Sequence, residues 1–151
     1  MGTIMRDKLD PQRDHLYEAQ REVFSKEQEK DLNELQDFVN GIVSEAWFTT
    51  RHPHIKSVVV KDGRGAQDAQ MSLDGKSMLL PKGTRYCYIA VHELGHRIDS
   101  SGGEDHGAIY TALFLFLVGR VYGLQVKENL ARRLKKHDVR WDHKIAKYGR
   151  P

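Results

Sequence analysis

The pentapeptide His92-Glu93-Leu94-Gly95-His96 constrains the fold of this chain more than any other stretch. It matches H-E-x-x-H, in which two histidines one helical turn apart can bind the same metal ion while the intervening glutamate transfers a proton. Residues four positions apart lie on one face of an α-helix. The pentapeptide therefore predicts a helix that presents two ligands of a metal site.

The residues around the pentapeptide have the hydrophobic pattern of an amphipathic helix. At 100° per residue, His92 and His96 lie opposite an apolar arc. Such a helix can bury one face while both imidazoles point into a cleft. A helix with two partly exposed histidines and no metal is the alternative interpretation. The apolar arc consists of Cys87, Ala90, Val91, Leu94 and Ile98.

Length and composition favour one domain over residues 1–151. With 39% hydrophobic and 30% charged residues, the chain is long enough to bury a core and has the composition of a globular protein. Cys87 is the only cysteine, and no apolar N-terminal segment follows basic residues, so we expect a cytoplasmic location. The longest apolar run, 108–118, is shorter than the roughly 20 residues of a membrane span. It predicts a core helix and no membrane partner.

Two helices are predicted before the first strand. Asp10 precedes a proline, as capping residues at helix starts often do, and predicts a helix over 11–24. Ser25 and Gln28 have the spacing of a capping box for a second helix that continues to about residue 47. Its apolar residues keep a period of 3.6 and predict a core face.

Three short strands are predicted next, so the fold class is α+β. Residues 55–61 are rich in valine, and 70–73 and 76–80 flank Asp74-Gly75, a signal for a two-residue type I′ hairpin. We expect a small antiparallel or mixed sheet of about three strands with helices packed on it. An edge strand of such a sheet can pair with an extended substrate. A sheet that only covers the helices is the alternative.

Helices are predicted again from the pentapeptide onward. Thr84 is a candidate cap for the helix that carries the pentapeptide, and turn residues end that helix near Ser100. The stretch 104–106 opens a fourth long helix, because its acids suit the positive end, and Gly123 ends it. A last helix is predicted over about 126–136.

A third metal ligand is needed, because catalytic zinc sites usually have three protein ligands and one water. His106 is our prediction, giving H-E-x-x-H-x9-H, since the Gly102-Gly103 turn returns the next helix over the first. Asp99, Glu104 and Asp105 are the alternatives. Asp99 lies about 10 Å along the helix axis from the first histidine of the pentapeptide. Either of the other two acids could instead orient a ligand.

The pentapeptide and the segment Asp105-His106-Gly107-Ala108-Ile109-Tyr110 together resemble a family of small zinc metallohydrolases of actinobacteria and their phages. In that family a His-Gly-x-x-aromatic segment follows the H-E-x-x-H helix. The segment is also similar to SprT-like metalloproteases, whose third zinc ligand is the later histidine, although their zinc ribbon is absent here. Tyr110 stands where Phe is usual. The resemblance extends to Arg6-Asp7, Gln12-Arg13 and Tyr17-Glu18-Ala19.

The resemblance implies a zincin-like fold, with a second ligand-bearing helix after the active-site helix, and a zinc-dependent peptidase. In a phage-encoded protein it would act in the host cytoplasm. Glu93 would take a proton from a zinc-activated water and pass it to the leaving amine of a peptide or protein substrate. Tyr110 or Tyr88 could stabilise the oxyanion, although both could instead be structural. The zinc ligands would be His92, His96 and His106.

The charge of the C-terminal segment supports an alternative function. From Lys127 onward nine Lys or Arg stand against three acids, a net charge of +6, so the remainder carries −3. A zinc-stabilised binding module could use this segment to bind nucleic acid or an acidic partner, with Trp141 and Tyr148 stacking on bases. A solvated helix face followed by a basic tail, 137–151, is the simpler interpretation. The remaining histidines are predicted surface residues: His15, His52, His54, His137 and His143.

Overall fold

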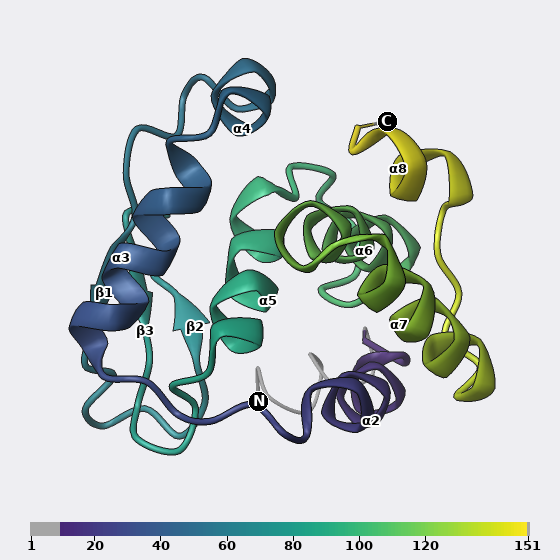
Figure 1. Cartoon of the computed structure of the whole chain (residues 1–151), viewed down its shortest axis with the longest axis horizontal. Coiled ribbons are helices and arrows are strands. Elements are labelled where there is room, and N and C mark those ends of the chain that lie inside the picture. Colours follow the sequence, from purple (N-terminus) through teal and green to yellow (C-terminus); the bar gives the residue numbers. More distant parts are fainter. Residues whose placement is uncertain (1–9, 151) are drawn as a thin grey trace. The chain divides into compact units, whose positions relative to one another are not determined.

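The computed structural model describes residues 10–150, which form seven α-helices and one three-stranded sheet (Figure 1). The predicted α+β class is confirmed, whereas a single zincin-like domain stays a prediction. Contacts divide the chain into two compact units. The central unit is Lys26–Ile98, and the terminal unit combines the residues up to Ser25 with those from Asp99 onward. Arg6-Asp7 lie outside the described residues.

In the central unit, α3 and α5 pack against the sheet. The strand order is β1-β3-β2, with β1 parallel to β3 and β2 antiparallel to it. The predicted small mixed sheet is therefore confirmed. The elements of this unit, in chain order, are α3 (Leu32–Val43), α4 (Ala46–Arg51), β1 (Val59–Lys61), β2 (Gln70–Met71), β3 (Ser77–Leu79) and α5 (Cys87–Ile98).

The start of α3 differs from the prediction. The capping box is formed by Asp31 and Glu34: the Asp31 carboxylate accepts the Glu34 N–H at 2.8 Å, and the Glu34 side chain accepts the Asp31 N–H at 3.2 Å. The predicted box of Ser25 and Gln28 is wrong, because Ser25 has helical backbone angles and ends the preceding helix. A cap residue needs extended backbone, which Asp31 has.

One helix boundary and one turn type in the central unit were also predicted wrongly. The second helix does not continue to residue 47, because α3 ends at Val43 and α4 begins separately at Ala46. The turn at Asp74-Gly75 is not of type I′, which needs a positive φ at both central residues. Gly75 has a φ of 72°, whereas Asp74 is not among the non-glycine residues with positive φ. The Asp74 carboxylate accepts the Ser72 hydroxyl at 2.6 Å and the Lys76 N–H at 3.0 Å, which stabilises a wider turn.

The terminal unit is helical and is built around α6. This helix is buried from Tyr110 to Val118, which confirms the predicted core helix. It packs against α7 and α8, and α7 also packs against α2 (Figure 1). Gly123, with a φ of 99°, ends α6 as predicted. The helices are α2 (Arg13–Phe24), α6 (Ala108–Tyr122), α7 (Leu124–Lys136) and α8 (His143–Tyr148).

Helix α8 was not predicted, since residues 137–151 show no clear hydrophobic period. It has only six residues and begins where the Asp142 carboxylate accepts the Ile145 N–H at 2.9 Å. Gly149, with a φ of 77°, ends it. Ile145 and Ala146 are its buried residues. A helix of this length has too few core positions for periodicity to reveal it.

Candidate metal centre

Helix α5 carries the pentapeptide in the central unit. Its predicted apolar arc is buried at Ala90, Val91, Leu94 and Ile98, with Cys87 half-buried. The Thr84 hydroxyl does not cap the helix, because it donates to the Pro81 carbonyl at 2.7 Å. The helix begins at Cys87 and ends at Ile98. The motif helix predicted from the sequence is confirmed with shorter ends.

The histidines and the glutamate of the motif in α5 are more deeply buried than residues on a solvent-exposed helix face. His92 is 1% exposed and Glu93 is 4% exposed, while His96 is half-buried. The ring centroids of the two histidines are 5.1 Å apart. Glutamate is rarely buried to this extent unless a partner or a function requires it. The burial of Glu93 is therefore the first structural sign that this helix is more than a packing element.

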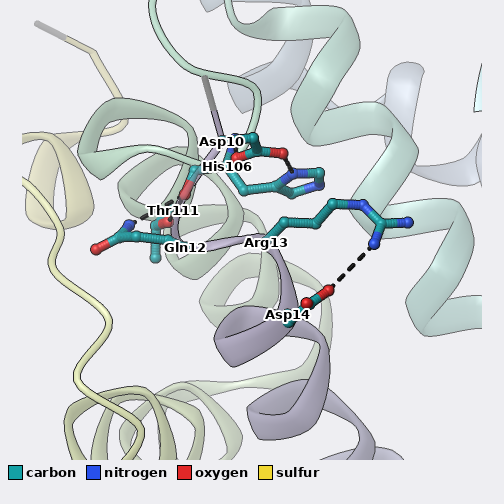
Figure 2. A network of polar contacts seen from close by, with 6 residues as sticks. All are labelled: Asp10, Gln12, Arg13, Asp14, His106 and Thr111. Carbon is teal, nitrogen blue, oxygen red and sulfur yellow. Dashed lines mark hydrogen bonds and ion pairs between the residues drawn. The ribbon is translucent and has the colours of Figure 1, made fainter. Parts of the chain in front are cut away.

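His106 lies in the terminal unit, in the turn before α6 and not inside the helix as predicted, because α6 begins at Ala108. It is 5% exposed. Asp10, 6% exposed, binds it twice: one carboxylate oxygen accepts the His106 N–H at 3.0 Å, and the other lies 2.6 Å from Nδ1 (Figure 2). Because an ionised carboxylate only accepts, we assign the ring proton to Nδ1. Nε2 then carries the lone pair that can bind a metal.

Other side chains of the terminal unit fix the position of His106. Its carbonyl accepts the Gln12 amide at 3.0 Å and the Thr111 hydroxyl at 3.4 Å (Figure 2). The Tyr17 ring lies 5.3 Å from the imidazole, and the Tyr110 ring lies 5.2 Å from it in an edge-to-face arrangement. Both the main chain and the ring of His106 are thus held in one orientation.

Burial lowers the pKa of His106, and this effect outweighs the opposing influence of the Asp10 hydrogen bond. The free-energy cost of removing the imidazolium from water exceeds the stabilisation that the nearby carboxylate provides. The ring therefore stays neutral to lower pH than an exposed histidine. A neutral imidazole is the form that binds a metal ion.

His92, His96 and His106 form a group that could hold a metal ion. One ligand atom of each lies within 4.8 Å of those of the other two. The acids proposed as alternative third ligands do not belong to this group: the Asp99 carboxylate accepts the Ser101 N–H at 3.0 Å, and Glu104 is exposed. Within residues 10–150, none of the other five histidines joins a group of this kind.

Asp10 is the site residue that the sequence did not identify. Its position before Pro11 predicted a helix cap, but α2 begins at Arg13, and Gln12 precedes it without a side-chain cap bond. The Asp10 carboxylate instead binds a residue 96 positions away. No local sequence pattern predicts a contact between residues so far apart in the chain. The general tendency of ligating histidines to donate to a carboxylate predicts only that some acid takes this position.

The two tyrosines considered for the oxyanion have structural surroundings. Tyr110 is fully buried and stacks on Phe114, with ring centroids 6.1 Å apart. Tyr88 is half-buried, its N–H donates to the Glu27 carboxylate at 2.9 Å, and its ring lies 5.6 Å from that of Tyr86. A role in stabilising an oxyanion stays a prediction for both residues.

Comparison with protein-family models, curated proteins and solved structures gives no match for this chain. The resemblance to zinc metallohydrolases therefore rests on the quoted motifs.

Proposed function

We propose that this protein is a zinc-dependent hydrolase, and specifically a metallopeptidase. The proposal rests on one observation: the two histidines of an H-E-x-x-H helix form a metal-capable group with His106, whose ring is oriented by a buried carboxylate. Hydrogen bonding of a ligating histidine to a carboxylate is typical of zinc sites. A histidine with a purely packing role has no need of this arrangement.

The donor set fits zinc. Three imidazoles are a common protein ligand set for catalytic zinc and leave one position for water. Nitrogen ligands of tetrahedral zinc lie about 3.4 Å apart at bond lengths of 2.0–2.1 Å, so small side-chain movements within the 4.8 Å spread would complete the site. A zinc ion held there would lower the pKa of a coordinated water toward 7 and polarise the substrate carbonyl.

Glu93 is the proposed general base. It follows His92 directly on α5, and it is only 4% exposed. Its carboxylate would accept a proton from the attacking water and deliver it to the leaving amine. Its burial excludes bulk water, which strengthens its electrostatic interaction with the reacting groups.

Strand β2 is the proposed substrate-binding edge. The other edge strand, β1, is engaged by Gln36 of α3: its side chain accepts the Val60 N–H at 2.7 Å and donates to the Val58 carbonyl at 2.9 Å. β2 pairs only with β3 within residues 10–150, and it packs next to α5. An extended peptide could add to this edge through main-chain hydrogen bonds.

The decisive variant is Glu93→Gln, with the exposed Glu104→Gln as the matched control. Zinc content and cleavage of an unfolded protein substrate are measured for both. We expect Glu93→Gln to retain zinc and to lose cleavage by at least about 100-fold, the scale of general-base catalysis, while Glu104→Gln behaves as wild type. Cleavage retained in Glu93→Gln would overturn the mechanism, and zinc binding without cleavage by wild type would favour a structural metal.

A further inference from the structure

A second candidate site lies in the terminal unit, in a pocket of about 550 Å³. It is formed by the last turns of α7 and the segment that leads to α8. Pockets of this size hold ligands of a few hundred daltons. The residues that line it are Ala131, Arg132, Lys135, Val139, Arg140, Trp141 and His143.

The Lys and Arg side chains that line the pocket give it a positive charge. Arg132, Lys135 and Arg140 are exposed, and none has an ion-pair partner within residues 10–150. Arg133, on the same helix but outside the pocket, instead lies 3.6 Å from Glu22. No acid lines the pocket. Three cations without counter-charges favour an anionic ligand.

The floor of the pocket is apolar and aromatic. Val139 is buried, Trp141 is half-buried, and the Trp141 ring centroid lies 5.2 Å from that of His143. A half-exposed indole offers a face on which a planar group can stack. Cations around an aromatic floor are the combination that proteins use to bind nucleotides, with phosphate on the cations and the base on the ring.

The pocket wall is fixed by hydrogen bonds. The Gln12 side chain accepts the Arg140 N–H at 2.6 Å and donates to the Arg140 carbonyl at 3.1 Å. The Asp142 N–H donates to the Ala108 carbonyl at 3.1 Å, and the Val139 N–H donates to the Leu134 carbonyl at 2.9 Å. A segment held at these points is preorganised, which lowers the entropy lost on binding.

We propose that this pocket binds a nucleotide unit, either a free nucleotide or part of a single-stranded nucleic acid. The cations would contact phosphate, and Trp141 would stack on the base. The aromatic floor favours a nucleotide over an acidic peptide, which needs only the cations. This site is independent of the proposed metal centre, so it stands whether or not the protein is a hydrolase.

The test measures binding of a fluorescein-labelled oligothymidylate of about twelve nucleotides, a length within the usual range of single-strand sites. Anisotropy is recorded at low and at physiological salt. The chain has two tryptophans, so Trp47→Phe makes Trp141 the only indole, and its fluorescence reports stacking directly. We expect saturable binding that weakens with salt, together with quenching of Trp141. Absence of binding to both the oligomer and free thymidine monophosphate at low salt would overturn the proposal.

Variants of equal charge separate the pocket from general attraction. Arg132→Gln/Arg140→Gln removes two pocket cations, whereas Lys136→Gln/Lys144→Gln removes two exposed cations from the same basic segment outside the pocket. We expect the first pair to weaken binding by about tenfold or more and to reduce the salt slope by about 1.4, at 0.7 per phosphate contact. The second pair should change affinity by less than about threefold. Equal losses in both would overturn the proposal.

Further measurements identify the ligand. Trp141→Leu should lose about tenfold in affinity, while Trp141→Phe keeps most of the stacking and the binding. Circular dichroism and thermal unfolding verify that each variant is folded. Competition by thymidine monophosphate would identify a free nucleotide as the source, and binding of the oligomer alone would identify a nucleic acid. Equal binding of oligoglutamate through the same arginines would overturn the proposal in favour of an acidic partner.

Discussion

Two histidines of the terminal unit lie beside carboxylates, but their surroundings suit different purposes. His106 and its partner Asp10 are 6% and 4% exposed as side chains, and 2.6 Å separates Nδ1 from the carboxylate. His137 has Nδ1 3.4 Å from Glu18 and Nε2 3.1 Å from Glu22, and these glutamates are 56% and 35% exposed. The first contact is buried and involves one ring nitrogen, whereas the second involves both ring nitrogens of a half-buried histidine and two more exposed glutamates.

The difference bears on which of the two histidines can bind a metal ion. A carboxylate at Nδ1 fixes the ring and leaves the lone pair at Nε2, as for His106. At His137 carboxylates lie beside both ring nitrogens, so neither nitrogen is left to bind a metal ion. Burial adds to the contrast, because it lowers the pKa of His106. Proximity of an acid to a histidine is therefore not enough to predict a metal site.

The largest expected effect comes from removing the imidazoles themselves. His106→Ala leaves two ligands, so zinc affinity, measured by competition with a chromophoric chelator, should fall by more than about 100-fold, beyond the usual effect of an outer partner. His137→Ala should bind zinc as wild type does. Equal affinities of the two variants would remove the distinction between the two histidines.

The next effect concerns the carboxylate that orients His106. Asp10→Ala should weaken zinc binding by about 10- to 100-fold, because the ring loses its fixed orientation and its partner at Nδ1. Asp14→Ala is the matched control, since Asp14 is exposed and, among the described residues, its carboxylate pairs with Arg13 alone, at 3.2 Å (Figure 2). Wild-type affinity in Asp10→Ala would mean that Asp10 has a structural role alone.

A smaller effect is expected at Gln12, whose amide holds the His106 carbonyl and both main-chain groups of Arg140. Gln12→Ala removes these bonds, each worth about 1 kcal/mol. Urea unfolding of the zinc-free protein should report a loss of about 1–3 kcal/mol, with a change in zinc affinity well below that of Asp10→Ala. A larger loss of zinc than in Asp10→Ala would show that the main chain, and not the ring, is the critical anchor.

The smallest expected effect is on the pH dependence of stability, through the contact between His137 and Glu22. The His137 imidazole, with Nε2 3.1 Å from the carboxylate, is the largest cause that lowers the pKa of Glu22 below 4.5. A depressed carboxylate contributes stability above its unfolded pKa, and that stability is lost as the pH falls through the folded value. His137→Ala should therefore lose slightly less stability than wild type as the pH falls below 4.5. Unfolding curves of the two proteins over this range check the sign, and a steeper loss in His137→Ala would contradict it.

The sequence predicted the elements whose signals are local. The helix that carries His92 and His96 and the buried helix α6 follow from hydrophobic periodicity, and the three strands follow from valine-rich and turn residues. One boundary was predicted wrongly where two candidate caps lie close together: Ser25 and Asp31 both suit a helix start, and the capping box forms at Asp31 and Glu34. Its signal is local, since Asp31 and Glu34 have the spacing of a capping box.

The residues that support the two candidate sites could not be predicted from local sequence patterns. Asp10 reaches His106 across 96 positions, and the Gln12 side chain reaches Arg140 across 128. Residues 11–24 show only the pattern of a helix. The basic residues near Trp141 were visible as a charge excess, but the pocket that they line depends on how α8 packs against α6.

The most direct test of the proposed metal centre is zinc K-edge X-ray absorption of the zinc-loaded protein. Three imidazole nitrogens at about 2.0–2.1 Å and one further oxygen ligand are expected. The same spectrum is expected from His137→Ala, and one fewer imidazole is expected from His106→Ala. A wild-type spectrum with only two imidazoles, or one unchanged in His106→Ala, would contradict the assignment of His106 as the third ligand.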